Sequence, residues 1–138
     1  MTAGAPTLAS ILLGTADPRR LRDWYAAAFL GNDDDGFTVV TPTLFACRFG
    51  GTSLLIDGRG DVVGTSPDPG RIILNFRVDD IRAVEERLVA LGAVWVRELE
   101  ATRWGIIGTV LDLDGNYVQI VEPAPGSPRC LHPEEDDG

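Results

Sequence analysis

The sequence predicts an α+β fold in which two tandem βαβββ modules form a single domain. An apolar strand, an aspartate and an amphipathic helix closed by glycine occur at residues 10–31 and again at 73–92. Three further strand-like segments follow each copy, and a stretch rich in Gly, Pro, Ser and Asp separates the copies. A repeat of this length is a supersecondary unit that buries a core shared with its neighbour.

The first module begins with a predicted strand at 8–15. Asp17 is placed to cap the following helix, with Pro18 at its first position. The helix extends to Gly31 and carries one apolar stripe, composed of Leu21, Trp24, Tyr25, Ala28 and Phe29. The remaining strands are predicted at 36–43, 44–49 and 53–57, and the Gly50-Gly51 pair is typical of a hairpin turn.

The second module repeats this order. A strand is predicted at 71–78, and Asp79 or Asp80 caps a helix that Gly92 closes. Three strands follow, at 93–98, 104–111 and 116–122. The expected organisation is a module at 7–57, a linker at 58–70, a module at 71–122 and a disordered acidic tail at 123–138.

Composition restricts the class of function. The net charge of −9 argues against nucleic-acid binding, which requires a basic surface. No apolar run has the length of a membrane span, and the N-terminus does not resemble a signal peptide, so a cytoplasmic protein without a membrane partner is expected. Cys47 and Cys130 are expected as free thiols, and the lone His132, in the tail, as inert.

Short motifs at corresponding places carry a family resemblance. They are Ala16-Asp17, Trp24-Tyr25, Val78-Asp79-Asp80, Ala90-Leu91-Gly92-Ala93, Trp104-Gly105 and Asp112-Leu113-Asp114-Gly115-Asn116. In this order they resemble the vicinal oxygen chelate superfamily, which includes glyoxalase I, extradiol dioxygenases, fosfomycin-resistance enzymes and bleomycin-resistance proteins. Leu113 stands where that family usually has proline. The resemblance implies a curved mixed sheet around a central cavity, with the helices on the outer face.

The resemblance also indicates where a metal would bind. The four ligand positions on the first and last strands of the modules are occupied by Ser10, Leu55, Ile73 and Gln119. Zinc, iron and manganese sites use His, Cys and carboxylates, so only Gln119 could supply an oxygen. We therefore expect a metal-free member without a cofactor, similar to the bleomycin-resistance type.

Strand periodicity separates cavity residues from core residues, because successive side chains point to opposite faces. The predicted cavity is mostly apolar with a few polar groups, as in small-molecule sites. The expected ligand-binding residues are Ser10, Leu12, Leu55, Asp57, Ile73, Asn75, Arg77, Trp104 and Gln119. The alternative for Arg77 is a salt bridge with Asp57 at the rim of the cavity. The alternative for Leu12, Leu55 and Ile73 is that they close into a core.

The tryptophans have two interpretations. Trp104 precedes Gly105 as in bleomycin-resistance proteins, where such a tryptophan can stack on a planar ligand. The alternative for Trp104 is core packing. Trp24 is expected in the core, and Trp95 in the core or in a dimer interface.

The preferred function is binding without chemistry. The chain is expected to sequester an aromatic or amphipathic small molecule, such as an antibiotic or secondary metabolite, and to form a homodimer because exposed sheet edges invite pairing. The alternative is a metal-independent lyase, isomerase or cyclase that acts on a small carbonyl metabolite through Arg77, Asp57 or Tyr25. The predicted cavity contains no histidine, which favours binding.

We predict that protein purified without chelator contains no stoichiometric divalent metal, because the residues at the four ligand positions are poor donors. Elemental analysis of the purified protein checks this. Stoichiometric zinc, iron, nickel or manganese that is lost on substitution of Gln119 contradicts the prediction.

Overall fold

The computed structural model describes residues 4–31 and 36–128. The first half comprises β1 (Ser10–Thr15), α1 (Pro18–Phe29), β2 (Thr38–Thr41), β3 (Leu44–Phe49) and β4 (Thr52–Gly58). The second half comprises the 3₁₀ turn η1 (Pro69–Arg71), β5 (Leu74–Arg77), α2 (Ile81–Ala90), β6 (Val94–Thr102), β7 (Gly105–Leu111) and β8 (Tyr117–Pro123). Cys130, His132 and most of the predicted tail lie outside the described residues.

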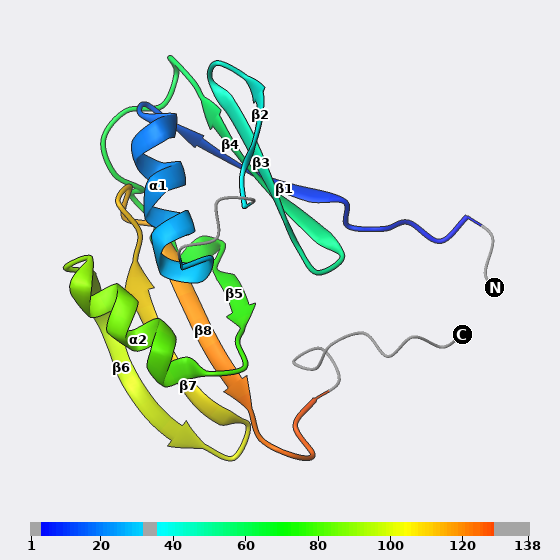
Figure 1. The fold of residues 1–138 in the computed structure, drawn as a ribbon, viewed down its shortest axis with the longest axis vertical. Helices are drawn as coiled ribbons and strands as arrows, with labels where there is room; N and C mark the ends of the chain where they lie inside the picture. Colours follow the sequence, from blue (N-terminus) through cyan, green and yellow to red (C-terminus); the bar gives the residue numbers. More distant parts are fainter. Residues whose placement is uncertain (1–3, 32–35, 129–138) are drawn as a thin grey trace.

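The strands form two four-stranded mixed sheets with the same topology (Figure 1). Sheet A has the order β1-β4-β3-β2, and sheet B has the order β5-β8-β7-β6. In each sheet the first and last strands of the module pair in parallel, and the other neighbours pair antiparallel. This confirms the predicted α+β class with two βαβββ modules. It also makes β1 and β5 edge strands, each at the border of its own sheet.

Two predicted strand boundaries differ from the structure by three residues or more. The strand expected from Arg71 begins only at Leu74, because Pro69–Arg71 forms a 3₁₀ turn. Proline presets the backbone for such a turn and has no N–H for a ladder. Ile73 therefore precedes β5. The strand expected to end at Glu98 continues to Thr102, since charged residues on an exposed edge strand hide its pattern.

Acidic side chains start both helices. Asp17 Oδ1 accepts a hydrogen bond from Arg20 N at 3.2 Å, and Asp80 Oδ1 accepts one from Ala83 N at 3.2 Å. Sequence alone left Asp79 and Asp80 open, and the structure assigns the cap to Asp80. Glu122 on β8 adds a long-range contact, because its Oε1 accepts from Ile81 N at 3.1 Å. The second helix is therefore fixed at its start by both the chain before it and the last strand.

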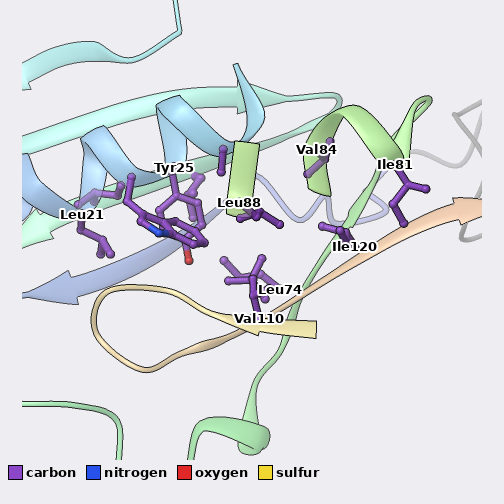
Figure 2. Close-up of a cluster of buried hydrophobic side chains, with 13 residues drawn as sticks. Leu21, Tyr25, Leu74, Ile81, Val84, Leu88, Val110 and Ile120 are labelled. Carbon is purple, nitrogen blue, oxygen red and sulfur yellow. The ribbon is translucent and has the colours of Figure 1, made fainter. Parts of the chain in front are cut away.

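The core lies where both helices meet the sheets (Figure 2). Leu21 and Tyr25 of α1 and Leu88 of α2 are at most 1% exposed. They pack with alternate residues of the strands, including Leu54, Ile56, Leu74, Val110, Val118 and Ile120. The packing agrees with the predicted core faces of β4, β5 and β8, whereas Val121, expected to face the cavity, is 1% exposed. Trp24 is buried in the same core, and Trp95 packs against it.

Aromatic rings connect the two modules. Phe29 of α1 stacks on Phe76 of β5 with ring centroids 4.1 Å apart and planes 16° apart. Phe49 of β3 meets Phe76 edge-on at 5.1 Å, and Tyr25 lies 6.3 Å from Phe76. Such offset-stacked and edge-to-face pairs stabilise beyond the area they bury. Phe76 thereby anchors the second module against two elements of the first.

A buried hydrogen bond crosses between the modules. The hydroxyl of Tyr25, which is fully buried, donates to Asp112 Oδ2 at 2.6 Å. The Asp112 carboxylate also accepts from Asp114 N at 2.9 Å and from Asn116 N at 3.0 Å. Burial, and then the nearby Asp112 charge, raise the pKa of Tyr25 well above its ordinary value. The phenol is therefore held neutral as a donor.

None of the helices in the described ranges combines the length and the apolar character needed to cross a membrane.

We predict that Tyr25→Phe lowers the free energy of unfolding by about 2 kcal/mol, because a hydrogen bond to a charged acceptor is lost inside the core. Urea unfolding followed by circular dichroism measures the change. Tyr117→Phe is the matched control, because the Tyr117 hydroxyl forms no hydrogen bond within the described residues.

The parent and the Tyr25→Phe variant should also differ in how their stability depends on pH above about pH 10. A raised pKa in the folded state stabilises the fold below the unfolded pKa of about 10, and this contribution is lost as pH rises through the folded pKa. The parent should therefore lose stability above about pH 10 more steeply than the Tyr25→Phe variant. Equal pH dependence of the two proteins would show that Tyr25 does not carry this coupling.

Candidate functional site

The candidate site is a seam between β1 and β5, the facing edge strands of the two modules. A cavity of about 290 Å³ lies there, and we call it the first chamber. Its walls are mostly apolar, and its polar lining residues are Thr52, Ser53 and Asn75, the last of which is exposed on β5. The lining residues include Leu8, Ile11, Phe49, Leu54, Ile72, Ile73, Leu74 and Phe76. An apolar cavity with few polar groups is the usual composition of a small-molecule site.

A second cavity lies farther along the same seam, and we call it the second chamber. It has a volume of about 240 Å³ and lies between β1, the start of β8 and the inter-module linker. Leu12 and Leu13 contribute apolar walls, while Ser66, Asp68, Arg71, Asn116 and Tyr117 bring polar atoms. The two chambers share Ile11, Ile72 and Leu74.

The structure divides the nine predicted ligand-binding residues among several places. Ile73 and Asn75 line the first chamber, and Leu12 lines the second. Leu12 is 47% exposed and Ile73 is 41% exposed, so neither is closed into a core. The others line neither chamber, namely Ser10, Leu55, Asp57, Arg77, Trp104 and Gln119.

The alternative pairing of Arg77 with Asp57 was wrong. Arg77 Nη1 instead lies 2.6 Å from Asp79 Oδ1, two residues along the chain. Asp57 lies 3.8 Å from Arg59 Nη1, and Arg59 Nη2 is held by Asp61 at 2.8 Å. Each residue pairs with a partner two positions away in sequence, because Arg77 and Asp57 belong to different sheets. Both charges are therefore committed to neighbours outside the chambers.

Trp104 lies in the turn between β6 and β7 and is not the first residue of a strand. The Arg103 guanidinium lies 4.3 Å from its ring centroid, and 38% of Trp104 is exposed. The adjacent glycine has a structural reason: Gly105 has a φ of 134°, and a Cβ there would lie 2.2 Å from the carbonyl oxygen of Glu122. The Trp-Gly motif thus allows β7 to start close to the end of β8.

The Asp112–Asn116 motif also builds structure. Asp112 caps its own turn, as described above, and Gly115, at a φ of 76°, lies against Thr65 of the linker. The Ser66 N–H donates to Asp114 O at 2.9 Å. Within the described part of the chain, Asp114 Oδ2 is buried without a hydrogen-bond partner. Burial, with a further contribution from nearby Asp112, raises the pKa of Asp114.

Few groups in the described residues suit metal or nucleophilic chemistry. No cluster of three or more His, Cys, Asp and Glu residues able to hold a metal ion occurs in 4–31 and 36–128. Cys47 is a buried free thiol, and burial raises its pKa, which disfavours the reactive thiolate. Tyr25, one of the acid–base candidates, is committed to Asp112 in the core.

Sequence reasoning missed Ile72 and Phe49 as lining residues. Ile72 lies in the segment that was predicted as strand, so its place between the chambers depends on the 3₁₀ turn before it. Phe49 belongs to β3 and reaches the seam through the fold of the whole module. The feature that identifies Ile72 as a lining residue is the 73% exposure of its large aliphatic side chain, which only the tertiary structure reveals.

A family model described as a glyoxalase-like domain matches residues 10–121. No curated protein matches the chain in sequence.

Solved structures with the same fold include three close in shape. An antibiotic binding protein, TnmS3 from Streptomyces sp. CB03234, is 21% identical with a TM-score of 0.67, covering 89% of this chain and 100% of that one. TioX from Micromonospora sp. ML1 is 20% identical with a TM-score of 0.66, covering 86% and 100%. A glyoxalase/bleomycin resistance protein/dioxygenase family enzyme from Burkholderia phytofirmans PsJN is 16% identical with a TM-score of 0.66, covering 86% and 100%.

Proposed function

The chain belongs to the glyoxalase-like domain family, and from this premise we propose that it binds a small aromatic or amphipathic molecule and sequesters it unchanged. The ligand class includes antibiotics and secondary metabolites, and no metal takes part. The observation that carries the proposal is the apolar first chamber at the seam, where Asn75 lies among aliphatic and aromatic side chains. The antibiotic binding protein TnmS3, which shares the fold, provides a precedent for such a role.

The walls of the first chamber support an aromatic ligand. Phe49 and Phe76 line it and are partly buried, and their contact with each other and with the core restricts their orientations. A planar ligand group can pack against such rings at low entropic cost. The Asn75 amide carries both a donor and an acceptor, and it can orient one polar group of the ligand.

The same geometry makes catalysis the weaker alternative. The acid–base candidates Tyr25, Arg77 and Asp57 line neither chamber, and each has a partner elsewhere. General acid–base catalysis needs a titratable group within hydrogen-bond reach of the substrate. Since the polar lining residues of the first chamber are Thr52, Ser53 and Asn75, binding is the function that its chemistry supports best.

We predict saturable binding of N-phenyl-1-naphthylamine, a small neutral aromatic probe, measured by its fluorescence. Asn75→Trp should weaken this binding by roughly tenfold or more, because the larger side chain fills the chamber. Val63→Trp is the matched control, because Val63 is 82% exposed and lines neither chamber. Circular dichroism verifies that both variants are folded.

Trp104→Ala separates this site from the stacking role suggested by sequence. Loss of a stacking anchor should cost about 2 kcal/mol, or roughly thirtyfold in affinity. A site at the seam instead leaves probe affinity within about twofold. If Trp104→Ala abolishes binding while Asn75→Trp leaves it intact, the ligand lies at the turn. The absence of saturable binding in the parent would overturn the proposed site itself.

We also propose a homodimer formed through the β6 edge. Val94 and Val96 are exposed on the same face of β6, at 60% and 46%, because the intervening Trp95 packs against the core. An open strand edge beside apolar side chains favours pairing with a second copy. Light scattering at micromolar concentration should show a dimer for the parent, and Val94→Lys should shift it toward monomer. A parent that is purely monomeric at this concentration contradicts the proposal.

A further inference from the structure

The two chambers share three lining residues, and only one of them has a side chain that is largely exposed and free to move. Of the three residues they share, Leu74 is 7% exposed in the core and Ile11 packs against the core. Ile72 is 73% exposed and sits between the 3₁₀ turn and β5, outside both elements. An exposed side chain changes rotamer within nanoseconds and at small cost. Ile72 is therefore the movable part of the partition.

Volume indicates that each chamber alone is small. Sites for drug-sized ligands occupy roughly 300–1,000 Å³. The chambers hold about 290 and 240 Å³, so each lies at the lower end of this range or below it, whereas the two together fall well within it. We propose that a single elongated ligand occupies both chambers and passes Ile72, which determines the length of ligand that is accepted. This inference rests on the proposed function and deepens it.

The far wall of the second chamber is held in place by the inter-module linker. Ser66 is fixed by its bond to Asp114 O, and Thr65 packs on Gly115. Gly70 lies against the Tyr117 ring: a side chain at position 70 would place its Cβ 3.5 Å from Tyr117 Cε2. The linker thus borders the second chamber, and its residues form part of the ligand site.

The linings assign the two ends of the ligand. The first chamber, with Phe49 and Phe76, suits an aromatic or aliphatic end. The second chamber has Tyr117 and Ser66, and its charged residues Asp68 and Arg71 lie 3.8 Å from one another, so their charges offset. It suits an uncharged end that forms hydrogen bonds. The ligand class is therefore an elongated, neutral, amphipathic molecule.

Two neutral probes of different length test this. N-phenyl-1-naphthylamine fits one chamber, and the longer planar dye Nile red requires both. Ile72→Trp should block the passage and weaken Nile red binding by roughly tenfold more than it weakens binding of the shorter probe, because Ile72 also lines the first chamber. Ile72→Ala should shift the ratio of the two dissociation constants in the opposite direction. Val63→Trp, in the same linker, is the control and should leave the ratio unchanged.

The outcomes separate this inference from the proposed function. If both probes bind the parent and neither Ile72 variant changes the ratio of their dissociation constants, the joined site is refuted and the single-chamber site survives. If neither probe binds the parent, the proposed function and this inference both fail. Opposite shifts of the ratio in the two Ile72 variants, with circular dichroism unchanged, support the joined site.

Discussion

The hydrogen bond from Tyr25 to Asp112 crosses between the modules inside the core, and the geometry of the seam depends on it. The described strands form two separate sheets, so no β-ladder fixes the angle between the modules. Side chains must do so, through this bond and the stack of Phe29 on Phe76. A buried carboxylate is costly unless its oxygens are paired, and Asp112 satisfies this with a phenol and its own turn. Because β1 and β5 remain edge strands, space is left between them, and the chambers lie there.

The motifs that mark the family explain the scaffold more than the ligand. Asp17 caps a helix, Gly105 admits a close strand, and Asp112 to Asn116 form a turn that receives Tyr25. Each role can be met in proteins with different ligands, which is why one fold hosts several functions. The residues that line the chambers include members of the linker and strand ends, where substitution disturbs the core least. Ligand choice can therefore vary while the motifs stay in place.

The balance between binding and catalysis depends on where the charged groups lie. Arg59 and Arg77 are held by aspartates near them in sequence, and the first chamber is lined by apolar side chains, Thr52, Ser53 and Asn75. Such a lining holds an amphipathic molecule through burial and a few oriented hydrogen bonds. The net charge of −9 then serves solubility, and it makes an anionic ligand the less favoured class.

The sequence by itself determined the two modules, the cap of the first helix and the core faces, because local periodicity and capping chemistry act over a few residues. It placed Tyr25 on the apolar stripe of the first helix, and it predicted that Ile73 and Asn75 line a cavity. It could not predict that Tyr25 bonds to Asp112, that Arg77 pairs with Asp79, or that Ile72 divides two chambers. These features depend on how two sheets without a common ladder pack together. The packing decides which strand edges face one another, and strand alternation carries no information about that arrangement.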